Sequence, residues 1–133
     1  IGYENISNEQ FVKKKYTTID PTCFAPIIDG MQMVLEDEDG TAKNCRVEYL
    51  TICGKTGTAE NTSGNREDHS IFIAFAPKEN PQIAIAVYVE NGGWGSTWAA
   101  PIATFMIEKY LKNEISNKHL EEFIINGNLI SNK

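Results

Sequence analysis

The sequence lacks several features that would assign a protein to a class at once. Its longest apolar runs, near Ile71 and Ile83, are far shorter than the roughly 20 residues that a membrane-spanning helix needs. The formal charge is −6, and no basic cluster exists beyond Lys13-Lys14-Lys15, which argues against nucleic acid as a partner. We interpret that triplet as a solvated edge of a strand or loop. Internal repeats, low-complexity stretches and a signal peptide are not seen either.

The sequence also has no group of residues with the spacing of metal ligands. Cys23, Cys45 and Cys53 follow no ligand pattern, and their odd number leaves at least one thiol unpaired. We expect Cys53 to be a small buried hydrophobe and not a reactive thiol. The run Glu36-Asp37-Glu38-Asp39 could in principle hold calcium, but no flanking ligand pattern supports this. We interpret the run as a solvated loop, because carboxylates are unfavourable at the negative end of a helix.

What the sequence does contain is enough for one core. A chain of 133 residues that is 41% hydrophobic predicts a single unit, residues 1–133. Residues 113–133 form a tail whose short amphipathic helix ends at Asn126-Gly127 and packs back on the body. The apolar positions of that helix are Leu120, Phe123, Ile124 and Ile125.

Hydrophobic periodicity predicts an α+β order of elements. A helix begins near Pro21 to Pro26 and ends at the acidic run, since apolar residues recur in it at three- and four-residue steps. The strand that carries Lys55, which we call the motif strand, comes next, and two more strands follow it, from Ser70 to Ala76 and from Gln82 to Glu90. The second has apolar residues on both faces, which predicts cover on both sides. An apolar helix over Trp98 to Leu111 comes next, with Ser96 or Thr97 as the expected N-cap.

Gly54-Lys55-Thr56-Gly57-Thr58 is the stretch with the clearest chemistry. In a strand, alternation sends Lys55 and Gly57 to one face and the two threonines to the other. Gly57 has no Cβ to keep a ligand backbone away, and it leaves the amide of Thr58 free to donate to a developing oxyanion. Lys55 adds positive charge. The alternative is a solvated lysine at a strand end followed by a glycine turn.

His69 is a second candidate near this strand. It follows Asp68 at the start of a strand that faces the motif strand, so it could border a substrate groove. A hydrogen-bonded structural imidazole is an equally good interpretation of His69, and His119 belongs to the tail.

Three segments together resemble the C-terminal part of a class B penicillin-binding protein. They are Gly54-Lys55-Thr56-Gly57-Thr58-Ala59-Glu60, the Asp68-His69-Ser70 step into a strand that ends Phe75-Ala76-Pro77, and Val89-Glu90-Asn91-Gly92-Gly93. Lys-Thr-Gly is one of the signatures of this family and of class A β-lactamases. The resemblance runs in register from about Phe24 to Leu111 and is nearest to the elongation-type transpeptidase, penicillin-binding protein 2.

This resemblance implies the fold and the activity. The expected fold is part of the β-lactamase/transpeptidase-like fold, with three antiparallel strands covered by helices. The expected parent enzyme is a serine D,D-transpeptidase that crosslinks peptidoglycan stem peptides, binds penicillin and needs no metal or organic cofactor. Lys55 and the hydroxyls of Thr56 and Thr58 would hold a terminal carboxylate, and the Thr58 amide would be an oxyanion donor. The setting would be the periplasmic face of the inner membrane, where disulfides are allowed.

The sequence departs from the family in one respect. The nucleophile motif Ser-x-x-Lys is absent, because no serine here has a lysine three positions later. Ser63-Gly64-Asn65 imitates the second motif, Ser-x-Asn, but lies after Lys-Thr-Gly instead of before it, so we interpret it as a loop. We therefore expect a soluble fragment, inactive alone, that begins at Ile1 because it was excised from a longer polypeptide with an N-terminal anchor.

Two other functions stay open at this point. The chain could be a noncatalytic interaction module whose sheet edge binds a partner strand, or a relative that senses β-lactams without turnover. If the N-terminal part of the transpeptidase domain is missing, a sheet edge and an apolar face lose their cover, so we expect the isolated chain to self-associate.

Overall fold

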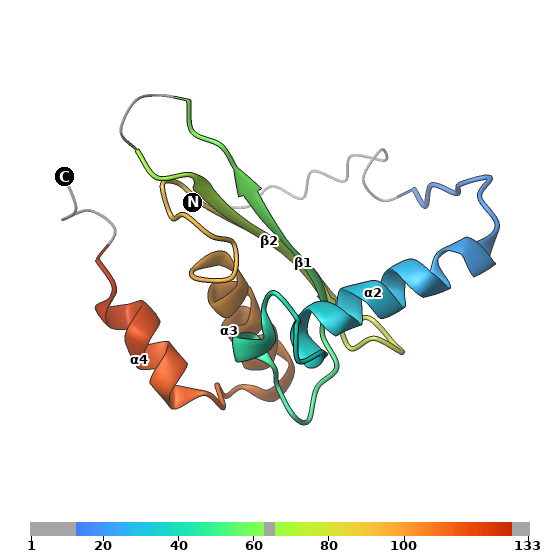
Figure 1. Cartoon of the computed structure of the whole chain (residues 1–133). Coiled ribbons are helices and arrows are strands. Elements are labelled where there is room, and N and C mark those ends of the chain that lie inside the picture. The colour runs from blue at the N-terminus through green and yellow to red at the C-terminus, as the bar shows by residue number, and fades with distance from the viewer. Residues whose placement is uncertain (1–12, 63–65, 129–133) are drawn as a thin grey trace, which may run out of the picture.

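The structure is a computed structural model that describes residues 13–62 and 66–128. The predicted loop Ser63-Gly64-Asn65 lies outside these residues. The α+β order is confirmed (Figure 1). In chain order the elements are η1 (Pro21–Cys23), α2 (Ala25–Glu36), η2 (Lys43–Cys45), β1 (Cys53–Ala59), β2 (His69–Ala76), β3 (Ile83–Val89), α3 (Ala99–Lys112) and α4 (Lys118–Asn126).

The first helical segment begins and ends where the sequence predicts. The carboxylate of Asp20 accepts a hydrogen bond from the Thr22 amide at 2.9 Å and so caps η1. Pro26 lies in the first turn of α2, where its missing N–H has no intrahelical partner to lose. The helix ends at Glu36, at the start of the acidic run, and α2 packs against β1.

The three strands form one antiparallel sheet in the order β1-β2-β3. Its register pairs Lys55 with Ile73 and Thr58 with Ser70, and on the other side of β2 it pairs Ile73 with Ala86. Paired residues share a face of the sheet. We call one side the covered face; it consists of Gly54, Thr56, Thr58, Ser70, Phe72, Ala74, Ala76, Ile83, Ile85, Val87 and Val89. We call the other side the open face, although Cys53 at one end of it is fully buried. It consists of Cys53, Lys55, Gly57, Ala59, His69, Ile71, Ile73, Phe75, Ala84, Ala86 and Tyr88.

The hydrophobic core lies between the covered face, α3 and the segment that runs from the end of α2 to the start of β1. Phe72 and Ala76 are fully buried there, together with Ala99, Ala103 and Ile107 of the helix. Alanine at two positions of this helix face lets α3 approach the sheet closely, and Phe72 fills the space that remains. Burying a side chain of that size stabilises the fold by about 1.5–3 kcal/mol.

The open face differs from the sequence prediction for β3, which expected cover on both sides. Tyr88 is 55% exposed and Ile73, on the neighbouring strand, is 47% exposed. Ala84 and Ala86 are exposed as well. Among the described residues, α3 packs against the covered face of β3. No other described element packs against the opposite face of this strand.

The C-terminal tail packs on the body, as predicted. Its helix α4 lies beside α3 (Figure 1), where the rings of Trp98 and Phe123 stack with their centroids 5.8 Å apart. Leu120 packs against the core. Within residues 13–62 and 66–128, no helix combines the length and the hydropathy that crossing a membrane requires.

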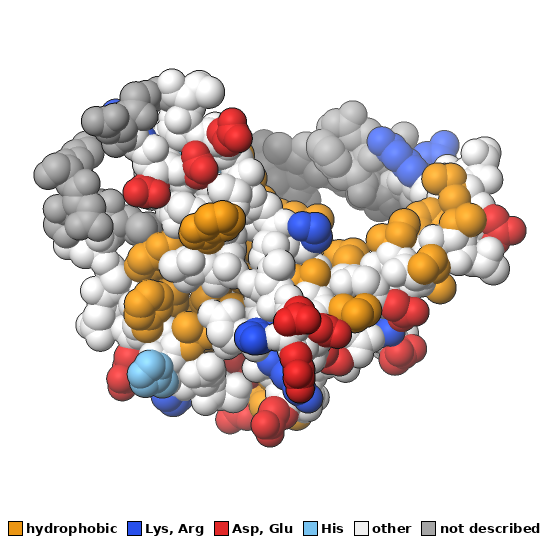
Figure 2. Space-filling view, in the orientation of Figure 1, with side chains coloured by type: hydrophobic (Ala, Val, Ile, Leu, Met, Phe, Trp, Pro, Cys, Tyr) orange, Lys and Arg blue, Asp and Glu red, His pale blue; other side chains and the backbone are white. Residues whose placement is uncertain are grey.

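Hydrophobic side chains also gather over the part of α2 that extends away from the sheet (Figure 2). Ile27 is 59% exposed and Met33 is 54% exposed, and Phe24 precedes them on the same segment. The predicted apolar stripe is therefore present in α2, but only its last turn, at Leu35, is buried in this chain.

Candidate substrate-binding strand

The motif Lys55-Thr56-Gly57-Thr58 lies on β1, which forms an edge of the three described strands. Lys55 and Gly57 belong to the open face and the two threonines to the covered face, as strand alternation predicts. The side chain of Lys55 is exposed and bends back, so that its Nζ donates to the carbonyl oxygen of Thr56 at 2.6 Å. An exposed ammonium group thus lies along the backbone of the edge strand.

The hydroxyl of Thr56 has a partner that the sequence did not indicate. Its Oγ1 lies 3.0 Å from Oγ1 of Thr41, and either atom can be the donor. Thr41 reaches this position because the chain turns tightly after α2: a Cβ on Gly40 would lie 2.6 Å from the carbonyl oxygen of Met33. Only the fold brings the two hydroxyls together, since fifteen residues separate them.

The start of α3 corrects one sequence prediction. The N-cap is Trp98, not Ser96 or Thr97, and its side chain makes no capping bond. The hydroxyl of Ser70 on β2 accepts from the Ala99 amide at 3.1 Å and donates to the carbonyl oxygen of Trp94 at 2.9 Å. A serine from the sheet therefore caps this helix, because the covered face lies directly against its first turn.

His69 lies on the open face at the end of the sheet where β1 finishes, opposite Ala59. Its Nδ1 accepts from the Asn91 amide at 3.1 Å, and its ring lies 5.2 Å from that of Tyr88. The bond to Nδ1 leaves the proton of the neutral ring on Nε2. Asn91, with φ of 54°, also accepts a bond from the Asn61 side chain at 2.7 Å. His69 is thus held in place beside the end of the motif strand.

All three cysteines are free. Cys53 is fully buried, as predicted, and burial raises the pKa of its thiol. Burial also raises the pKa of Cys45 to about 12, against a weaker opposite effect of Thr104. Both buried thiols are therefore protonated and inert at neutral pH, whereas Cys23 is exposed.

The acidic run after α2 makes local bonds. Asp37 accepts from the Asp39 amide at 2.9 Å, and Glu36 accepts from the side chain of Gln32 at 2.6 Å. In the part of the chain that the structure describes, no three His, Cys, Asp or Glu side chains come together as metal ligands would.

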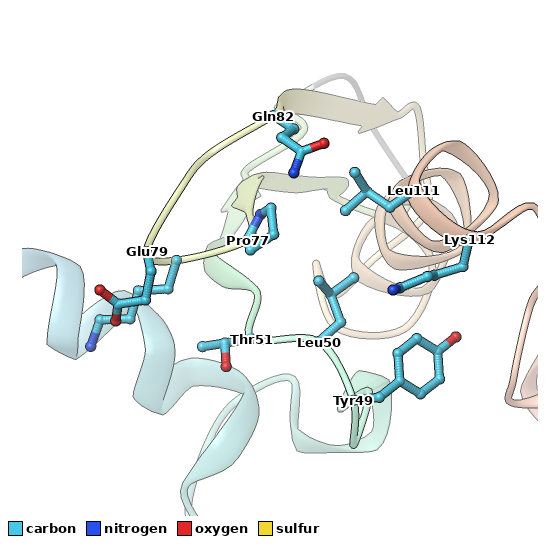
Figure 3. Close-up of a pocket in the computed structure, with 9 residues that line it drawn as sticks. Tyr49, Leu50, Thr51, Pro77, Glu79, Gln82, Leu111 and Lys112 are labelled. Carbon is cyan, nitrogen blue, oxygen red and sulfur yellow. The ribbon is translucent and has the colours of Figure 1, made fainter.

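A cavity of about 330 Å³ lies at the opposite end of the sheet from Thr58. Figure 3 shows it between the turn that follows β2 and the last turn of α3, with Leu50, Gln82 and Leu111 pointing into it. No motif residue lines it. The motif is accessible because it lies on an edge strand, and not because it lies in this cavity.

The family model of the penicillin-binding protein transpeptidase domain matches residues 3–108, which is most of the chain. Among curated proteins, the peptidoglycan D,D-transpeptidase MrdA of Haemophilus influenzae is 33% identical over 100 residues, 65% of this chain and 15% of that protein. MrdA of Acinetobacter baumannii is 34% identical over 110 residues, 71% of this chain and 16% of that protein. The chain thus spans about a sixth of the length of these relatives.

Solved structures agree with the sequence matches. Penicillin-binding protein 2 of Pseudomonas aeruginosa, in complex with WCK 5153, superposes with a TM-score of 0.67 at 35% identity over 80% of this chain and 23% of that one. Penicillin-binding protein A of Mycobacterium tuberculosis gives a TM-score of 0.62 at 30% identity over 75% and 23%. The expected transpeptidase-like fold is therefore confirmed, with similarity to the penicillin-binding protein 2 type. Sequence, strand order and these matches agree that the chain belongs to the penicillin-binding protein transpeptidase family.

Proposed function

We propose that this chain supplies the substrate-binding strand of a serine D,D-transpeptidase that crosslinks peptidoglycan stem peptides. The observation that carries the proposal is the position of Lys55-Thr56-Gly57-Thr58 on an edge strand, with the lysine exposed. An edge strand can accept an extended peptide by main-chain pairing, which is a common way for proteins to bind peptides. The curated relatives named peptidoglycan D,D-transpeptidases support the reaction class.

In this proposal the motif side chains hold the terminal carboxylate of the stem peptide. Lys55 supplies the charge, and its Nζ already lies at the backbone of β1 through its bond to Thr56 O. Thr56 and Thr58 add hydroxyl donors. Because the Thr56 hydroxyl lies 3.0 Å from that of Thr41, the Thr41 oxygen can accept the Thr56 proton or orient it toward the ligand.

The main chain supplies the second function of the strand. The amide of Thr58 would donate to the oxyanion that develops as the peptide carbonyl is attacked. Gly57 has no side chain on the open face to block that approach, and the Cβ it lacks would lie 3.3 Å from Ile71. Removing one donor of this kind from an enzyme typically costs about 3–4 kcal/mol in activation free energy. His69 would border the same end of the groove.

β-Lactams are the second proposed ligand. They carry a carboxylate next to a reactive carbonyl, which matches the pair of functions assigned to Lys55 and Thr58. A structure of penicillin-binding protein A from M. tuberculosis is described as an imipenem acyl-enzyme complex, and it superposes with a TM-score of 0.59 at 34% identity. We place the intact protein at the periplasmic face of the inner membrane, where its substrate would be.

No serine in this chain has a lysine three positions later, so we infer that the nucleophile lies elsewhere in the intact protein and expect no covalent product from the chain alone. The test is incubation with a fluorescent penicillin followed by denaturing gel electrophoresis. A complete class B transpeptidase serves as the positive control, and the expected result is a labelled band for that control only. A labelled band at the mass of the 133-residue chain would refute the proposed division of roles.

The role of Lys55 is tested in a complete transpeptidase that contains this segment. Lys55→Ala should slow acylation by a β-lactam about a hundredfold, as expected for the loss of a group that binds and orients the reacting molecule. The melting temperature should change little, because the side chain is exposed. Lys109→Ala, at an exposed position of α3, is the matched control and should acylate at the parent rate. Acylation of Lys55→Ala at the parent rate would show that the assigned role is wrong.

A further inference from the structure

The segment between β3 and α3 lies directly behind the motif. We call residues 91–98 the glycine loop; they read Asn91-Gly92-Gly93-Trp94-Gly95-Ser96-Thr97-Trp98. Gly95 is buried so close to β1 and β2 that a Cβ there would lie 2.5 Å from the carbonyl oxygen of Gly57 and would collide with that of Ile71. This contact brings main chain against main chain, which only glycine allows.

Ser70 places the loop against the same point of the strand. It is the cross-strand partner of Thr58 and is fully buried. Its hydroxyl bonds both sides of Gly95, since it donates to Trp94 O and accepts from the Ala99 amide. The glycine loop thus packs behind the backbone of Gly57 on the covered face, opposite the side where Lys55 projects. The carbonyl of Gly57 belongs to the same peptide group as the Thr58 amide, although the Thr58 side chain itself is exposed.

The loop is itself held at several points. The Gly93 amide donates to Asp68 O at 2.7 Å, just before β2 begins. The Ala100 amide donates to Gly95 O at 2.9 Å, which joins the loop to the first turn of α3. Since α3 packs in the core and has more buried residues than any other described helix, these bonds connect the back of the motif strand to a well-buried element.

We infer that Ser70 and Gly95 are positioning residues, which hold the main chain of Gly57 and Thr58 where the Thr58 amide can donate to the oxyanion. The inference rests on the proposed function. An edge strand such as β1 needs support from outside the sheet to keep its main chain in place. Ladder bonds to β2 restrain β1 within the plane of the sheet, but a strand with one described neighbour can still bend out of that plane. An oxyanion donor must be fixed before the reaction starts, and the glycine loop blocks movement toward the covered face.

The test compares two glycine-to-alanine variants in a complete transpeptidase that contains this segment. Gly95→Ala forces the loop and β1 apart, whereas Gly30→Ala adds a methyl group to α2 with no atom within 4 Å. Displacing a reacting group by about 1 Å can cost on the order of a hundredfold, so Gly95→Ala should lower the first-order rate of β-lactam acylation at least tenfold. The dissociation constant of the noncovalent complex should change much less, because Lys55 is untouched.

Two outcomes separate this inference from the function on which it rests. If Lys55→Ala loses acylation and Gly95→Ala acylates like Gly30→Ala, the positioning role is wrong and the proposed function stands. If neither variant differs from the parent, both are wrong. All rates are measured well below the melting temperature of each variant, so that unfolding does not contribute.

If the Gly95→Ala protein does not fold, a milder variant and a direct measurement still test the inference. Ser70→Ala removes the hydroxyl without adding atoms. In the 133-residue chain, the ¹H–¹⁵N signals of Gly57 and Thr58 should move in Ser70→Ala while those of β3 near Ile83, at the other end of the sheet, stay in place. Unmoved signals at Gly57 and Thr58 would overturn the inference without any assay of activity.

Discussion

The two faces of the sheet are built from similar residues but have different surroundings. On β2, Phe72 of the covered face is fully buried, whereas Ile73, its neighbour in sequence, is 47% exposed on the open face. On β3, the valines and isoleucines of the covered face are half-buried and Tyr88 is 55% exposed. Hydrophobic composition alone therefore does not identify which face stabilises this chain; the position of α3 does.

The two sides of the motif Lys55-Thr56-Gly57-Thr58 also differ in their surroundings. On the covered side, Gly95 packs against the backbone of Gly57 and Ser70 pairs with Thr58, while the open side presents Lys55. The edge of β1 that pairs with no described strand is available for a ligand, with Lys55 on one side of it and the exposed Thr58 on the other, while Gly95 packs against Gly57 from the covered side. The three predictions below test this contrast, beginning with the largest expected effect.

The largest effect should come from truncating neighbouring residues on opposite faces. Phe72→Ala should lower the free energy of unfolding by about 3–5 kcal/mol, because it opens a cavity beneath α3. Ile73→Ala should cost less than about 1 kcal/mol, because half of that side chain is already exposed. Urea unfolding of the 133-residue chain measures both. Equal costs would mean that the open face is covered in solution.

An intermediate effect is expected at the end of α3. Glu108 is 1% exposed and accepts from Tyr49 Oη and Ser116 Oγ, each at 2.6 Å. Tyr49→Phe leaves that buried carboxylate short of a donor and should cost about 1–3 kcal/mol. Tyr88→Phe, on the open face, is the matched control and should change stability by less than about 0.5 kcal/mol.

This second prediction has a pH dependence. The hydrogen bond to Glu108, together with burial, raises the pKa of Tyr49 above its usual value of 10.0. A raised pKa in the folded state means that the stabilisation is complete below pH 10 and is lost as pH rises through the higher pKa. The difference in stability between the parent and Tyr49→Phe should therefore narrow above pH 10. A difference that stays constant would show that the phenol is not bonded to the carboxylate.

The smallest effect concerns association between chains. The open face, and the edge of β3 that pairs with no described strand, should make the 133-residue chain self-associate as its concentration rises, since exposed apolar faces and strand edges bind other chains. Ile73→Lys combined with Tyr88→Lys should shift the population toward monomer, which size exclusion with light scattering can measure. Ile125→Lys, at an exposed position of α4, is the control and should leave association unchanged. A parent that stays monomeric at all concentrations would contradict this prediction.

Local patterns were sufficient to predict the three α-helices and three strands that the structure describes, but not the short helical segments η1 and η2. The apolar stripe of α2, the strands β2 and β3 and the amphipathic α4 were predicted to within one or two residues of their observed bounds. The alternation of Lys55 and Thr56 on β1 was also predicted, because it depends only on strand geometry. These features depend on residues close together in the chain.

Other features of the candidate site could not be predicted in this way. The N-cap of α3 was assigned to Ser96 or Thr97 from sequence proximity, yet Ser70, 29 residues away, makes that bond. Thr41 beside Thr56 gave no sequence signal, and neither did the contact of Gly95 with β1. The position of Ser70 could have been predicted in part, because counting residues along the hairpin between β1 and β2 places Ser70 opposite Thr58.

The sequence by itself determined which segments are helical or extended, and that one strand carries a lysine, two hydroxyls and a glycine in the order that its family uses. Only the tertiary structure decided which face of the sheet is buried and what lies behind Gly57 and Thr58. The physical reason is that helix and strand periods are set by contacts within a few residues, whereas the side that α3 covers, and the contact of Gly95 with β1, depend on packing between elements far apart in the chain.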